Sequence, residues 1–181
     1  MASGVYRTRT LRGAFSGAIA AALWALEQPL DKAVFESEYD DVEVLGRALV
    51  SGDGWYPVGL AWHLTNGAVF GAIYANLAPA IPLPPFLRGP TVALSETFAT
   101  WPLGSLSDRL HPRRKKLPTL AGNRKALAQA ALRHLLFGVA LGELERRLNT
   151  VPEPVPPLPD ADFSSNGHGS LEHAITAESP E

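Results

Sequence analysis

The stretch that decides the fold covers residues 54–87 and reads GWYPVGLAWHLTNGAVFGAIYANLAPAIPLPPFL. None of these 34 residues is Asp, Glu, Lys or Arg. A helix surrounded by water needs a strongly polar face, so a charge-free stretch of this length favours lipid as its surroundings. Its middle, residues 58–77, has about the 20 residues that cross ~30 Å of hydrocarbon. The stretch therefore predicts a membrane-spanning helix.

Three shorter apolar segments accompany this stretch, at residues 13–26, 89–106 and 126–142. Each is slightly short or slightly polar for a span by itself, but the four segments together predict four helices. We therefore expect an all-α fold, a four-helix transmembrane bundle, with the lipid bilayer as its partner and the inner (plasma) membrane as its location. Small residues recur at helical spacing on each segment, as at Gly13 and Gly17, and predict close helix packing.

Two alternatives stay open. The first segment follows three arginines, and it would also fit a cleaved signal peptide, but no small-x-small cleavage site follows it. The second alternative is a water-soluble helical bundle, and the charge-free stretch is the main argument against it. The orientation of the four spans also stays open, because basic residues are spread over both sides.

Composition divides the chain into three parts. Residues 1–10 are expected to form an N-terminal tail, and residues 11–148 the four-span membrane domain. The last part, residues 149–181, contains six acidic residues and several prolines but no Lys or Arg. This composition cannot bury enough apolar surface to offset its ordering entropy, so it predicts a disordered C-terminal tail.

The charge pattern limits the classes of partner. The net charge is −2, so the chain has no general basic character and nucleic acid is not expected as a partner. One basic run, Arg113, Arg114, Lys115 and Lys116, lies between the third and fourth segments. It could contact anionic lipid head groups or be an ordinary solvated loop. The sequence allows a homo-oligomer without indicating one.

Each apolar segment carries or borders one ionisable side chain. These are Glu27, His63, Glu96 and His134, and Asn66 lies about one turn beyond His63. At 1.5 Å of rise per residue, Glu27 and His63 come out at similar depth, His134 about a turn deeper and Glu96 near the midplane, so the four could meet in one half of the bundle and Asn66 could join them. We therefore expect them to form one polar cluster inside the membrane. Such side chains are costly in lipid unless they are paired, which makes them candidates for a functional site.

Three interpretations of this cluster compete. Its members could be Glu–His pairs that hold the helices together, or they could line a path for protons or small ions. In the third interpretation, Glu27, His63, Glu96 and His134 bind a divalent metal such as zinc or iron. Arg133 complicates all three, because it points about 100° away from its neighbour His134. It could pair with Glu96 or another carboxylate, border a polar cavity, or face water in a soluble bundle.

A family resemblance joins several of these positions. The chain resembles the YagU-like inner-membrane proteins of bacteria over residues 11–148. The matching positions are Glu27-x-Pro29, His63, Trp101-Pro102, His134, Glu143 and Arg146-Arg147. The resemblance implies a multi-pass inner-membrane protein of uncharacterised activity.

No nucleotide-binding or hydrolase motif occurs, and we assign no catalytic residue. The leading hypothesis is a non-enzymatic multi-pass membrane protein of unknown activity, whose buried cluster is structural or handles protons or small ions. The alternative is a metal-dependent membrane enzyme that uses the Glu/His cluster. The sequence names no cofactor and no substrate.

Overall fold

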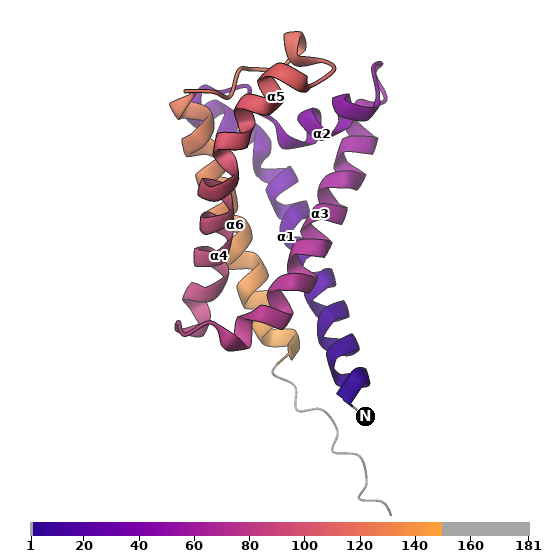
Figure 1. Cartoon of the computed structure of the whole chain (residues 1–181), viewed down its shortest axis with the longest axis vertical. Coiled ribbons are helices and arrows are strands. Elements are labelled where there is room, and N and C mark those ends of the chain that lie inside the picture. The colour runs from indigo at the N-terminus through magenta and orange to yellow at the C-terminus, as the bar shows by residue number, and fades with distance from the viewer. Residues whose placement is uncertain (1, 150–181) are drawn as a thin grey trace, which may run out of the picture. The chain divides into compact units, whose positions relative to one another are not determined.

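The computed structural model describes residues 2–149, and in this part of the chain every regular element is helical (Figure 1). The side chains of residues 2–6 are not described. The elements in chain order are α1 (Ala2–Phe35), α2 (Asp41–Leu49), α3 (Trp55–Leu77), η1 (Ala78–Ala80), α4 (Pro85–Thr100), η2 (Trp101–Leu103), α5 (Gly104–Leu110), η3 (Arg114–Lys116) and α6 (Arg124–Asn149). The expected all-α class is confirmed. The tail expected at residues 149–181 lies outside the described residues, apart from Asn149 at the end of α6.

The expectation of membrane spans is wrong. Among residues 2–149, no helix combines the length and the apolar character that crossing a bilayer requires. The helix α3 is long enough and uncharged, but His63, Asn66 and Asn76 lower its mean hydropathy. The helix α4 has only 16 residues, and α6 carries charges along its length, including Arg133. This finding overturns the four-span bundle, the inner-membrane location and both functions that depended on them.

The helices α1 and α3 pack with their backbones in contact. A Cβ atom added at Gly17 would lie 2.0 Å from the carbonyl oxygen of Gly67, and one at Gly71 would lie 2.2 Å from that of Gly13. No side chain fits into such gaps, so these positions admit only glycine. The small residues that the sequence analysis placed on one face of each segment therefore mark a helix–helix contact.

Glycine also allows close backbone contact between two further pairs of helices. A Cβ atom at Gly59 of α3 would lie 2.0 Å from the carbonyl oxygen of Val42 in α2. A Cβ atom at Gly89 of α4 would lie 2.1 Å from that of Gly138 in α6. The helix α1 also packs on α6. The result is a pair α1–α3 with α2 across one end of α3, and a pair α4–α6 beside it (Figure 1).

The main apolar core lies between these two helix pairs. It contains Ala20, Ala21, Trp24, Tyr74, Ala78, Ala93, Phe137 and Leu141. Four of these eight residues are alanine, so the helices approach closely and the larger side chains fill the remaining space. The core ends where polar side chains begin, at His63 of α3 and Glu96 of α4, and the candidate site lies at this boundary.

Candidate functional site

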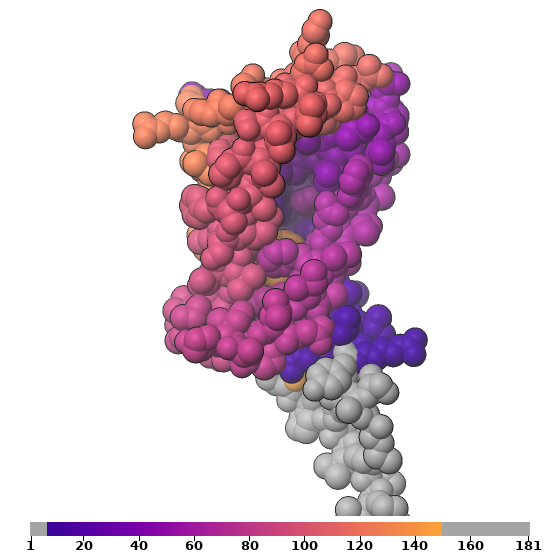
Figure 2. Space-filling view, viewed as in Figure 1, coloured from indigo at the N-terminus to yellow at the C-terminus, as the bar shows by residue number. Residues whose placement is uncertain are grey.

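A cavity of about 230 Å³ lies between the two helix pairs. Figure 2 shows the hollow between α3 on one side and α4 on the other. The residues that line it come from α1, α2, α3, α4 and α6, and they are Ala21, Trp24, Asp41, Val44, Leu45, His63, Asn66, Gly67, Phe70, Glu96, His134 and Phe137. A second cavity of about 200 Å³ shares Asp41, Glu96 and His134 with the first.

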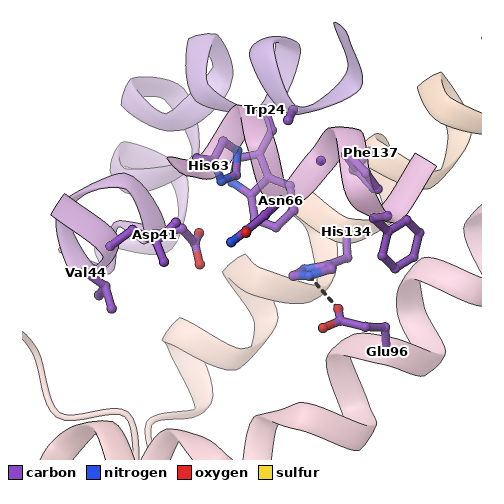
Figure 3. Close-up of a pocket in the computed structure, with 12 residues that line it drawn as sticks. Trp24, Asp41, Val44, His63, Asn66, Glu96, His134 and Phe137 are labelled. Atoms are coloured by element: carbon purple, nitrogen blue, oxygen red, sulfur yellow. Dashed lines mark ion pairs between the residues drawn. The ribbon is translucent and has the colours of Figure 1, made fainter. Parts of the chain in front are cut away.

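Helical spacing explains why these side chains meet. His63, Asn66 and Phe70 follow one another at steps of three and four residues, so they lie on one face of α3. His134 and Phe137 are three residues apart on α6 and share a face in the same way. The cavity therefore combines aromatic and polar side chains, and regular helices supply both kinds (Figure 3).

His134 and Glu96 form an ion pair that crosses from α6 to α4 (Figure 3). The Nε2 atom of His134 lies 3.0 Å from Oε2 of Glu96, and its Nδ1 atom lies 2.8 Å from the carbonyl oxygen of Ala130. The imidazole of His134 therefore bridges Glu96 of α4 and the backbone of α6.

Trp24 of α1 stands between the two histidines of the cavity. Its ring centroid is 5.1 Å from that of His63 and 4.5 Å from that of His134, and both contacts are edge-to-face. Phe137 makes a third edge-to-face contact with it at 6.0 Å. These contacts fix the orientation of the indole and of both imidazoles.

His63 is an uncharged histidine. Burial lowers its pKa below the ordinary value of 6.5, and the nearby charge of Arg133 also lowers it, while Asp41 and a hydrogen bond to the backbone of Ala21 oppose the shift. Only 7% of the residue is exposed, and its Nε2 atom is buried without a hydrogen-bond partner among the described residues. The neutral imidazole is therefore the form that this environment favours.

Beside the cavity lies a buried ion network centred on Arg133. Its guanidinium donates two hydrogen bonds to Asp31 of α1 and one, of 2.8 Å, to Asp41 of α2. The same group lies over the ring of Tyr39, 5.6 Å from the ring centroid, and donates to the Tyr39 carbonyl oxygen at 3.1 Å. Gln129 donates to Asp31 at 2.8 Å. The network joins α1, α2 and α6 at one point.

The network raises the pKa of two of its members, Arg133 and Tyr39. Burial by itself lowers the pKa of Arg133, but the hydrogen bonds and charges of Asp31 and Asp41 outweigh it and leave the pKa raised. Burial and the neighbouring carboxylate of Asp41 raise the pKa of the Tyr39 phenol well above its usual value. Arg133 therefore stays positively charged and the Tyr39 phenol stays protonated. The Tyr39 hydroxyl donates a hydrogen bond to Asp41.

The structure brings together four of the five residues expected in the polar cluster. His63, Asn66, Glu96 and His134 line the cavity, whereas Glu27 is not among the lining residues. Burial raises the pKa of Glu27, and so does the carboxylate of Asp31, four residues further along α1. Among residues 2–149, no three His, Cys, Asp or Glu side chains are arranged so that they could hold a metal ion.

Sequence reasoning missed Asp31, Tyr39 and Asp41. The first segment was expected to end at residue 26, so Asp31 was assigned to a connecting loop, whereas α1 continues past Pro29 to Phe35. One signal was present: a carboxylate was one of the partners open to Arg133, and residues 31–43 are rich in Asp and Glu. Comparison of the chain with protein-family models, with curated proteins and with solved structures finds no significant match.

Proposed function

We propose that the protein binds a small, uncharged, ring-containing molecule in the cavity between its two helix pairs. The observation that carries the proposal is the mixed lining: Trp24, Phe70 and Phe137 supply aromatic surface, and Asn66, Glu96 and His134 supply polar groups. Ligand sites in proteins combine apolar walls with a few placed polar groups in this way.

The size of the cavity limits the ligand. An engineered apolar cavity of about 150 Å³ binds benzene, and this cavity measures about 230 Å³. It has room for one aromatic ring with a polar substituent. Lipids, nucleotides and peptides are too large to enter it whole.

The charges of the lining favour a neutral ligand. Asp41 is paired with Arg133, Glu96 is paired with His134, and burial keeps His63 uncharged. An ionic ligand would lose its hydration on entering the cavity, and it would meet no unpaired opposite charge there. This loss is unfavourable. A neutral molecule does not have this cost of removing a charge from water.

Asn66 is the group best placed to recognise the polar edge of such a ligand. Its side chain points into the cavity (Figure 3), and it makes no hydrogen bond to any other described residue. A free amide offers both a donor and an acceptor, so a carboxamide on the ligand could bond to it twice. The edges of Trp24 and Phe137 would then pack on the ring.

The test compares three probes of similar shape by saturation-transfer NMR and by titration calorimetry. Benzamide is neutral, benzoate is an anion and benzylamine is a cation. We expect benzamide to bind more tightly than either ion. Equal binding of all three, or binding of none, would overturn the proposal.

Variants then locate the binding. Asn66→Ala should weaken benzamide binding at least fivefold, and Val44→Phe should abolish it by filling the cavity from α2. The matched control is Asn76→Ala, which removes an amide from the same helix outside the cavity and should leave the affinity unchanged. Binding that survives both cavity variants would show that benzamide sits elsewhere.

A further inference from the structure

The outer face of α1 is apolar over most of its length. Every exposed side chain of α1 between Leu11 and Val34 is apolar, and Leu26 and Val34 are 76% and 75% exposed. At 1.5 Å of rise per residue, this strip is roughly 35 Å long. A contiguous exposed apolar strip of this kind marks an interaction site. We call these exposed apolar residues the α1 outer face.

The exposed residues of the α1 outer face have nearly the same sequence spacing whether α1 is followed from its N-terminal or its C-terminal end. Two such helices placed antiparallel would set Leu11 against Val34, Phe15 against Leu30 and Ile19 against Leu26. Leu23 would then lie next to the two-fold axis. Each large side chain on one copy meets a large side chain on the other, so the face is complementary to itself.

The charges at the two ends of α1 select the antiparallel arrangement. Near the N-terminal end, Arg7 is exposed and Arg12 is partly exposed, and the exposed acids Glu36 and Glu38 follow the C-terminal end. An antiparallel pair brings the basic end of one copy to the acidic end of the other, whereas a parallel pair would bring like charges together. The ion pair of Glu36 with Lys125 is exposed on both sides, so it leaves the acidic end open to a partner.

We propose that the α1 outer face is the interface between two copies of this chain, with α1 antiparallel to its symmetry mate. A two-fold axis requires the same patch on both subunits, and a self-complementary strip satisfies this requirement. The proposal is independent of the cavity, because Leu11, Leu23 and Val34 do not line it.

Cysteine crosslinking tests the arrangement directly, because the chain contains no cysteine and each introduced thiol is the only one. Leu23→Cys should form a disulfide-linked dimer under mild oxidation. Leu11→Cys and Val34→Cys should not crosslink when each is alone, and they should crosslink when the two proteins are mixed. Efficient crosslinking of Leu11→Cys with itself would show a parallel pair and overturn the proposal.

Sedimentation equilibrium tests the energetics. Ile19→Glu places a charge in the middle of the strip and should raise the dimer dissociation constant at least tenfold. Its matched control is Val69→Glu on α3, because Val69 is also apolar and is 55% exposed. The Val69→Glu variant should still form the dimer. Arg7→Glu should weaken the dimer, and adding Glu38→Lys to it should restore the affinity.

Two other outcomes would overturn the proposal. The wild-type chain could be monomeric at all concentrations up to the millimolar range. It could also remain monomeric and bind phosphatidylcholine vesicles in a flotation assay, in a manner that Ile19→Glu abolishes. The second result would assign the α1 outer face to a lipid surface instead of a second copy.

Discussion

Arg133 of α6 and Asp31 of α1 form a doubly hydrogen-bonded ion pair in which neither side chain is exposed to solvent. The two residues are far apart in sequence, and the same two helices are joined near their other ends by the ion pair of Arg9 with Glu145. The third bond of the guanidinium, to Asp41, brings the start of α2 to the same point. The position of α2 beside the cavity therefore depends on a buried charge in α6.

Removing Asp31 should destabilise the fold strongly. Asp31→Ala leaves the guanidinium of Arg133 buried with only one carboxylate, and breaking a buried pair in this way typically costs about 3–5 kcal/mol. Urea unfolding followed by circular dichroism measures the loss. Glu143→Ala is the control, because it removes an exposed carboxylate from α6 and should change the midpoint very little. Equal effects of the two variants would mean that the buried pair does not stabilise this fold.

Gly17→Ala should destabilise the α1–α3 contact. The new methyl group would lie 2.0 Å from a backbone carbonyl oxygen, which cannot rotate away as a side chain can. Overpacking of this kind typically costs about 1–3 kcal/mol. Gly52→Ala is the matched control, because nothing lies within 4 Å of a Cβ atom there. Thermal unfolding of the two variants should differ clearly, and similar melting temperatures would contradict the close packing of the two helices.

Glu27 should make stability fall as the pH rises. Burial and Asp31 raise its pKa above the ordinary 4.5, so the folded state keeps the proton after the unfolded state has lost it. Stability is then greatest below pH 4.5 and declines as the pH passes through the raised value. Glu27→Gln imitates the protonated form, and it should raise stability at pH 7 and reduce the decline. A urea midpoint at pH 7 that is unchanged or lower in the variant would contradict this assignment.

His63 should make stability fall as the pH falls. Burial lowers its pKa below 6.5, so as the pH falls through 6.5 the unfolded state gains a proton that the folded state does not. Stability is then complete above pH 6.5 and is lost as the pH falls toward the lowered value. The imidazole resonances in a two-dimensional NMR titration report this pKa directly. A value for His63 at or above 6.5 would show that the ring is not held in its neutral form.

Much of the helix packing could be predicted from the sequence, because it rests on a local pattern. Gly13 and Gly17 lie one turn apart, and so do Gly67 and Gly71, and the structure places the two pairs in contact. The rise of 1.5 Å per residue placed Glu27 level with His63, whereas the cavity is lined by His63, Asn66, Glu96 and His134 without Glu27.

The surroundings of the helices could not be predicted in the same way. The absence of charge in residues 54–87 favours lipid, but uncharged polar side chains such as His63 and Asn76 lower the hydropathy of α3. The partners of Arg133 were missed for a different reason. Whether Asp31 lies in a loop or in a helix depends on Pro29, which α1 accommodates within its length, and no local pattern decides that.

The glycine contacts also have an evolutionary consequence. Polar residues at a cavity can be exchanged as a ligand changes, and apolar residues on an outer face can replace one another freely. A position at which a Cβ atom would lie about 2 Å from a neighbouring backbone oxygen has only one permitted amino acid. A distant homologue should therefore be recognisable by the glycines at positions 17, 46, 59, 71 and 89, even after every side chain around the cavity has diverged.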